Sequence, residues 1–123
     1  MNDKKFSLSD RLRSFRYALN GIRLLFQKEH NARIHLAAAA VVIGAGFVFK
    51  INPTEWIAIL LCIALVIGME ALNSAIEKLA DVVSPQHSAQ IKRVKDISAG
   101  AVLICAVIAL IVGCIVFIPK IWS

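Results

Sequence analysis

The chain has 123 residues, of which 59% are hydrophobic, and its mean hydropathy is +0.73. A water-soluble domain of this length cannot bury so much apolar surface, because small chains bury a smaller fraction of their surface on folding. The composition therefore excludes an ordinary soluble fold. It predicts a single all-α integral membrane domain over residues 1–123.

The formal net charge of +6 is concentrated in two segments. The first 33 residues hold eight of the 14 Lys and Arg residues, and residues 78–95 hold four more. Such blocks suit an anionic membrane face or a phosphorylated ligand. Nucleic acid is not an expected partner, because no aromatic–basic interleaving or groove-reading motif accompanies them. The three cysteines lie inside apolar runs, which argues against a disulfide framework.

The first predicted element is an amphipathic surface helix over about residues 8–28. Its apolar residues recur at intervals of three and four, which places them on one helical face: Leu8, Leu12, Phe15, Leu19, Ile22 and Phe26. Ser7 is suited to cap the first free amides of this helix. A basic amphipathic helix beside membrane spans is expected to lie in the headgroup plane, and a packed helix of a soluble cap is the alternative.

Three apolar runs follow and predict transmembrane helices over about residues 33–51, 55–83 and 96–118. The uncharged part of the first run covers only about 24 Å at 1.5 Å per residue, which is short of the ~30 Å hydrocarbon layer. Arg33 and Lys50 at its two ends can extend this span by snorkelling to the interface.

Helix boundaries are expected at four positions along these runs. The second span should begin at Pro53, whose fixed φ suits the first turn of a helix, and should end at Ser84. The third span should open at Lys95 and close at Pro119, because proline cannot continue a helix normally.

The distribution of Lys and Arg predicts the orientation of the spans. Positive residues favour the cytoplasmic side, so the amino terminus and the 84–96 loop are both expected to face the cytoplasm. The two basic segments can lie on the same side of the membrane only if the short first apolar run also crosses the membrane. The sequence therefore predicts a multi-pass protein of the cytoplasmic (inner) membrane.

The second predicted span carries a polar stripe. Glu70, Asn73, Glu77 and Asp81 are separated by three, four and four residues, which places them on one helical face. Ionisable groups inside a span are costly and usually mark a pathway or a site. Glu70 is flanked by apolar residues and suits a general base. The alternative is that the stripe only packs against another helix, and this explanation applies best to Asn73 and Asp81.

Further charged residues are expected on the same membrane side. Lys95 and Asp96 are expected to open the third span; the free amides of that helix start and the charge of Lys95 suit a phosphate, although ordinary positive-inside flanking is the alternative. Glu29 adds a carboxylate after the amphipathic helix. The sequence contains no Walker A loop, no Gly-rich kinase loop and no Cys/His metal cluster, so any nucleotide site must be built from scattered side chains.

Three function classes are compatible with these residues. The first is a phosphotransferase from ATP to a lipid alcohol, and the second is a proton- or cation-coupled carrier that uses Glu70 as a relay. The third is a small structural subunit, for which Glu70 would be a needless cost. A carrier needs neither a nucleotide nor the additional charges at Glu29 and Lys95.

Two stretches resemble the small prokaryotic membrane lipid kinases, which phosphorylate diacylglycerol or undecaprenol. They are Glu70-Ala-Leu-Asn-Ser-Ala-Ile-Glu77 and Lys95-Asp-Ile-Ser-Ala-Gly-Ala-Val-Leu103, and the resemblance extends from about Tyr17 to the carboxyl end. It implies an ATP-dependent lipid kinase that needs Mg²⁺. It also implies a homotrimer of three-span subunits with active sites shared between neighbours.

The resemblance implies specific roles for individual residues. Glu70 is the expected general base, and Asn73 and Asp81 are expected to support the catalytic site. Glu29 and Glu77 are the expected Mg²⁺ ligands. The residues expected to contact ATP or its metal are Tyr17, Glu29, Glu77, Gln86, His87, Ser88, Lys95 and Asp96.

The chain departs from the diacylglycerol kinases at two places. His35 stands where they tend to have a second acidic residue, and Asp10 stands where an arginine is expected, with Arg11 one position on. The roles of Asp10 and Arg11 stay open. Residues 46–50, 54–56 and 119–122 are more similar to the undecaprenol kinase branch. The expected substrate is therefore undecaprenol, with diacylglycerol as the alternative.

Overall fold

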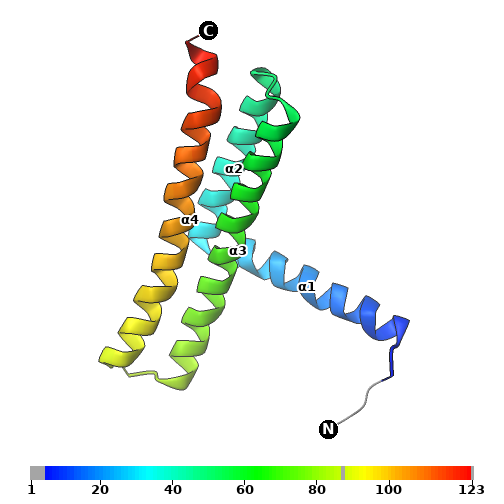
Figure 1. Cartoon of the computed structure of the whole chain (residues 1–123). Helices are drawn as coiled ribbons and strands as arrows, with labels where there is room; N and C mark the ends of the chain where they lie inside the picture. Colours follow the sequence, from blue (N-terminus) through cyan, green and yellow to red (C-terminus); the bar gives the residue numbers. More distant parts are fainter. Residues whose placement is uncertain (1–4, 87, 123) are drawn as a thin grey trace.

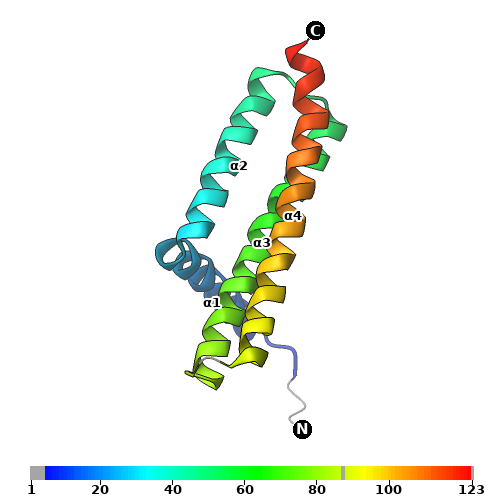
Figure 2. The ribbon, with the colours of Figure 1, turned by 90° about the vertical axis from the view of Figure 1, so that its left-hand side faces the viewer.

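The computed structural model describes residues 5–86 and 88–122, and these residues form four helices with no strand. The helices are α1 (Leu8–Lys28), α2 (His30–Val48), α3 (Pro53–Val83) and α4 (Ala89–Ile121). The last three form a bundle, and α1 projects from its side (Figure 1). The turned view shows α4 alongside α3 and set off from α2 (Figure 2).

The bundle helices are long and apolar enough to cross a membrane. At 1.5 Å per residue, α2 is about 28 Å long, which nearly matches the ~30 Å hydrocarbon layer. By the same measure α3 and α4 are about 46 and 50 Å long. Their extra length projects beyond the start of α2, on the side where residues 84–88 connect them (Figure 1). The all-α membrane architecture predicted from the sequence is confirmed.

The amphipathic helix α1 begins at a turn that is capped by Ser7, as expected from the sequence. The Ser7 hydroxyl accepts a hydrogen bond from the Asp10 amide at 3.4 Å. Leu25 is buried, but the apolar residues before it on the same face are exposed. An uncovered apolar face at the level where α2 begins suits the headgroup plane better than a packed cap.

One extended residue, Glu29, separates α1 from α2 and sets the angle between them. The guanidinium of Arg33 reaches back across this break and donates to the carbonyl of Phe26 at 2.7 Å and to that of Gln27. These carbonyls lie at the end of α1, where they lack helical partners. Arg33 was expected to snorkel, but in the structure its guanidinium caps α1.

The turn between α2 and α3 is a Schellman motif. Lys50 adopts a left-handed φ of 52°, and the Ile51 amide donates to the Gly46 carbonyl at 3.1 Å. This pairing closes the end of α2. Glycine at position 46 also leaves room for Trp56, because a Cβ there would lie 2.6 Å from the Trp56 ring. The sequence therefore fixes a close approach of α2 and α3 at this end.

The start of α3 is tied to the end of α4. Asn52 and Glu55 form a capping box around Pro53, which occupies the first turn as expected. The Glu55 carboxylate also lies 3.1 Å from the Lys120 ammonium. The buried apolar cluster at this end consists of Ile51, Ile59 and Val116. This end of the bundle is thus closed by packing and ion pairing.

The structure differs from the sequence-based expectation at both ends of α4. The helix begins at Ala89, where the Ser88 hydroxyl accepts a hydrogen bond from the Ile91 amide at 3.1 Å. Serine is a strong N-cap, so the helix starts there and Lys95 lies in its second turn. Pro119 was expected to close the helix, yet α4 continues to Ile121. Proline removes its own amide donor, but the Trp122 amide donates to the Ile118 carbonyl at 3.3 Å and continues the last turn past it.

Candidate active site

The polar stripe on α3 runs from a buried to an exposed environment. Glu70 and Asn73 are 4% and 7% exposed, Glu77 is half-buried, and Asp81 is exposed. Side-chain exposure therefore increases along α3 toward the connection to α4. The stripe therefore joins a buried carboxylate within the span to charged groups near its end.

The nearest described polar partner of Glu70 comes from α2. The Nε2 atom of His35 lies 3.8 Å from Oε2 of Glu70. The sequence distinguished His35 only as a departure from the diacylglycerol kinases and did not pair it with Glu70. No spacing rule relates residues on two different helices, so no local signal could have found this contact.

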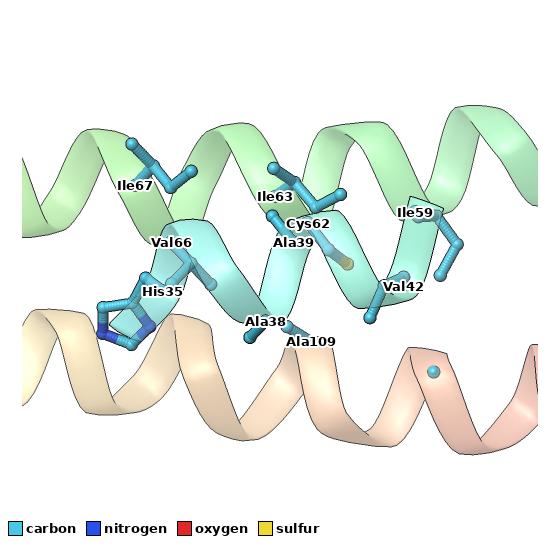
Figure 3. A pocket seen from close by; sticks show the side chains of 11 residues that line it. His35, Ala38, Ala39, Val42, Ile59, Cys62, Ile63, Val66, Ile67 and Ala109 are labelled. Carbon is cyan, nitrogen blue, oxygen red and sulfur yellow. The ribbon is translucent and has the colours of Figure 1, made fainter. Parts of the chain in front are cut away.

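His35 also marks one end of an apolar cavity between α2, α3 and α4. This cavity has a volume of about 110 Å³, and its lining includes Ala38, Val42 and Val66 (Figure 3). A second hollow of about 390 Å³ lies between α2 and α4 and is also lined by His35. Its remaining lining is apolar or small, and includes Phe117 near the far end of α4. Apolar space therefore leads along the bundle to His35, the residue whose imidazole lies 3.8 Å from Glu70.

Glu29 lies at the junction of α1 and α2. Its carboxylate is 3.4 Å from the Lys78 ammonium on α3. Glu29 and Glu77 both lie within electrostatic range of Glu70, so the structure brings the three predicted carboxylates into one region. Among residues 5–86 and 88–122, no group of three or more His, Cys, Asp or Glu side chains is arranged to hold a metal ion.

Two ion pairs organise the extended ends of α3 and α4. The Lys95 ammonium lies 2.6 Å from Asp81, and the Lys92 ammonium lies 2.7 Å from Asp96. A hollow of about 550 Å³ beside them is lined by Ser88, Lys92, Lys95 and two neighbouring residues. Sequence reasoning predicted Ser88 and Lys95 for this place. It counted Lys92 only as part of a basic segment.

The other predicted nucleotide contacts are not gathered at this hollow. Tyr17 is exposed on α1, and no hydrogen bond or ring contact among the described residues joins it to the rest of the site. Gln86 is exposed in the connection, where its carbonyl accepts a hydrogen bond from the Ser84 hydroxyl. His87 lies outside the described residues.

Two buried polar atoms on α3 lack hydrogen-bond partners within the described part of the chain. They are Oδ1 of Asn73 and the Ser74 hydroxyl. An unsatisfied buried polar group costs about 1–3 kcal/mol, so native proteins rarely leave one without a function or a further partner. These atoms lie between Glu70 and Glu77 in the sequence. Their position indicates a polar site along this face of α3.

The comparison with known families bears directly on these features. The profile of the prokaryotic diacylglycerol kinase family matches residues 16–117, which include the polar stripe, the connection and Lys95. The chain belongs to this family. The resemblance drawn from the Glu70–Glu77 and Lys95–Leu103 stretches is confirmed by this match.

Relatives in the prokaryotic diacylglycerol kinase family include enzymes named for two lipids. An undecaprenol kinase of Bacillus subtilis (strain 168) is 37% identical over 118 residues, which are 96% of each chain. A diacylglycerol kinase of Synechocystis is 34% identical over 111 residues, 89% of this chain and 63% of the relative. A diacylglycerol kinase of Haemophilus influenzae is 27% identical over 115 residues, 93% of this chain and 98% of the relative.

Proposed function

We propose that this chain transfers the γ-phosphoryl group of ATP to the hydroxyl of a membrane lipid alcohol. The observation that carries the proposal is the buried Glu70 carboxylate, which begins the polar stripe of α3 and lies 3.8 Å from His35, a residue that lines two apolar cavities. Membership in the prokaryotic diacylglycerol kinase family supports the same reaction. Nothing in the structure favours the carrier that Glu70 alone would also allow.

Glu70 is the proposed general base. The proton of the lipid hydroxyl moves to its carboxylate, and the hydroxyl oxygen bonds to the γ-phosphorus of ATP. The bond from that phosphorus to the β–γ bridging oxygen breaks, and ADP leaves with the bonding electrons. Asn73, whose side-chain oxygen is buried and has no hydrogen-bond partner among the described residues, supports the site from the next turn of α3.

The lipid is proposed to approach from the side of the bundle. The cavities that end at His35 have apolar linings, so they suit a hydrocarbon chain whose hydroxyl lies at the depth of Glu70. This placement keeps water from the reacting hydroxyl. It also separates the lipid from the charged nucleotide, which approaches from the 84–88 side.

The nucleotide is proposed to bind where α4 begins. Ser88, Lys92 and Lys95 line a hollow there, and the charges of the two lysines and the first free amides of α4 suit a phosphate. Lys95 has to exchange its contact with Asp81 for a phosphate oxygen. Exposed pairs of this kind contribute only about 0–1 kcal/mol, so the exchange costs little. Tyr17, Gln86, His87 and Asp96 are proposed as further contacts.

Glu29 and Glu77 are the proposed holders of Mg²⁺. Carboxylate oxygens are the ligands that this ion prefers, and it typically takes only one or two from the protein while phosphates and water complete its shell. A set of two carboxylates fits that requirement. The ion would neutralise charge on the phosphate oxygens.

A homotrimer with shared active sites is proposed as the working assembly. The bundle exposes large apolar residues along all three spans. Within one chain, Tyr17 also stays apart from the hollow near Lys95 that it is expected to serve. A neighbouring copy can supply the missing side of such a site. In the cell, the protein is proposed to lie in the cytoplasmic membrane with both basic segments inside.

The orientation predicts which engineered cysteines a membrane-impermeant thiol reagent can reach in intact cells. Thr54→Cys should react from outside, because Thr54 is exposed at the start of α3 and its replacement spares the Asn52 cap. Gln90→Cys, exposed at the start of α4, should react only after the cells are opened. The unaltered protein, whose three cysteines lie within the spans, is the control. The reverse pattern would contradict the orientation.

The lipid preference is tested with radiolabelled ATP and purified protein in detergent. We expect kcat/KM to be roughly tenfold higher for undecaprenol than for diacylglycerol, equivalent to about 1.4 kcal/mol of differential transition-state binding. The reason is that His35 replaces an acidic side chain that could position glycerol oxygens. Equal rates or a preference for diacylglycerol would defeat the assignment to the undecaprenol branch. Labelling of neither lipid would defeat the proposed function.

A further inference from the structure

Glu70 is in an unusual position for a carboxylate. It is the one ionisable side chain that is buried among the described residues. No hydrogen bond to its oxygens is formed within residues 5–86 and 88–122. An ionised carboxylate without partners in an apolar interior is unfavourable by several kcal/mol. A base at this position therefore needs a donor that compensates its charge.

The charged residues around Glu70 leave few candidates for that donor. Glu29 and Glu77 carry the same charge as Glu70 and lie within electrostatic range of it. The nearby cations are engaged elsewhere, since Lys78 pairs with Glu29 and Lys95 pairs with Asp81. The group that remains is the imidazole of His35.

The His35 imidazole faces the carboxylate directly. The distance of 3.8 Å between Nε2 and Oε2 exceeds a normal N–H···O hydrogen bond by somewhat less than an ångström. At this separation the two groups are in electrostatic range without a hydrogen bond, and forming the bond requires one of the two side chains to move by that amount. His35 is 24% exposed and lines both apolar cavities, so it is also next to the proposed lipid path.

We propose that His35 is a positioning residue for Glu70. Its Nε2–H donates to Oε2 of Glu70, which compensates the charge and leaves Oε1 to accept the proton of the lipid hydroxyl. The inference rests on the proposed role of Glu70 as general base. It gives His35 a role in the rate of the reaction, in addition to any effect on the choice of lipid.

The proposal is tested by two replacements of His35 assayed with undecaprenol and ATP. His35→Leu removes the donor, so we expect kcat to fall roughly tenfold while KM for ATP stays within about twofold. His35→Gln keeps an N–H donor at similar reach and should restore kcat to within about threefold of the unaltered protein. If His35→Leu does not fold, His35→Asn replaces it, because its shorter side chain stays polar but falls short of Glu70. An unchanged kcat, or a change in KM alone, would overturn the proposal.

A double-mutant cycle separates positioning from packing and from contact with substrate. If His35 acts only through Glu70, His35→Leu should cause no further loss when it is added to Glu70→Gln. A second tenfold loss in that background would overturn the proposal. The cycle also separates the two hypotheses: full turnover by Glu70→Gln alone would defeat the base assignment, whereas an additive His35→Leu effect defeats only the positioning role.

Discussion

Glu70→Gln should lower the rate of lipid phosphorylation by roughly 100-fold or more while ATP binding is retained. General-base catalysis typically contributes about 10²–10⁴-fold, and glutamine has the same shape but cannot accept the proton. Glu70 lies within the span, whereas the proposed phosphate contacts lie near the start of α4. The measurements are the single-turnover rate with undecaprenol and the binding of a labelled ATP analogue.

Protein stability distinguishes this loss from a failure to fold. Glu70 is buried, and burying a charge is unfavourable, so a neutral glutamine should not lower the thermal unfolding temperature in detergent. A variant that is inactive but at least as stable as the unaltered protein is therefore expected. An inactive variant with a much lower unfolding temperature would not count in favour of the base.

A matched control is available on the same helix. Glu55 is a carboxylate at the opposite end of α3, where it pairs with Lys120 and caps the helix. Glu55→Gln makes the same chemical change far from the proposed site, and turnover should stay within about twofold. Near-normal turnover of Glu70→Gln, or an equal loss in both variants, would contradict the assignment of Glu70 as base.

The parts of the fold that could be predicted from the sequence depend on local patterns. The capped start of α1 at Ser7 and the turn before Pro53 follow from residues within a few positions of each other. The same holds for the stripe from Glu70 to Asp81, because the helical period alone places these residues on one face. The buried-to-exposed gradient along the stripe also follows from where the apolar run ends.

The remaining features depend on contacts between helices, which no single-helix pattern encodes. The approach of His35 to Glu70 requires the crossing of α2 and α3, which Gly46 and Trp56 help to fix at the other end. The pairing of Lys95 with Asp81 joins residues 14 positions apart across the connection. The start of α4 at Ala89 was missed because the apolar pattern begins later than the helix itself. Helix propensity and the N-cap at Ser88 determine where α4 begins.

Glu29→Gln and Glu77→Gln should each raise the Mg²⁺ concentration needed for half-maximal rate, by roughly 10- to 100-fold. Even residues that only support metal ligands typically cost this much in metal affinity when changed, and a ligand that loses its charge should cost no less. The measurement is the initial rate across a Mg²⁺ titration at fixed ATP, with Glu55→Gln as the control. An unchanged Mg²⁺ dependence in both variants would remove these residues from the metal site.

Replacing Lys78 tests the same metal site, but it should change the Mg²⁺ requirement in the opposite direction. Its ammonium lies 3.4 Å from the Glu29 carboxylate, so it competes with a metal ion for that group. Lys78→Gln removes the competitor and should lower the Mg²⁺ concentration for half-maximal rate. The Lys78 side chain is 63% exposed, and exposed ion pairs contribute about 0.2–1 kcal/mol, so the shift should be no more than about fivefold. General damage to the enzyme would lower the maximal rate or raise the Mg²⁺ requirement. A decrease in the requirement for Lys78→Gln, together with an increase for Glu29→Gln, is expected if Glu29 binds the metal, and an unchanged or raised requirement for Lys78→Gln would contradict the proposed competition.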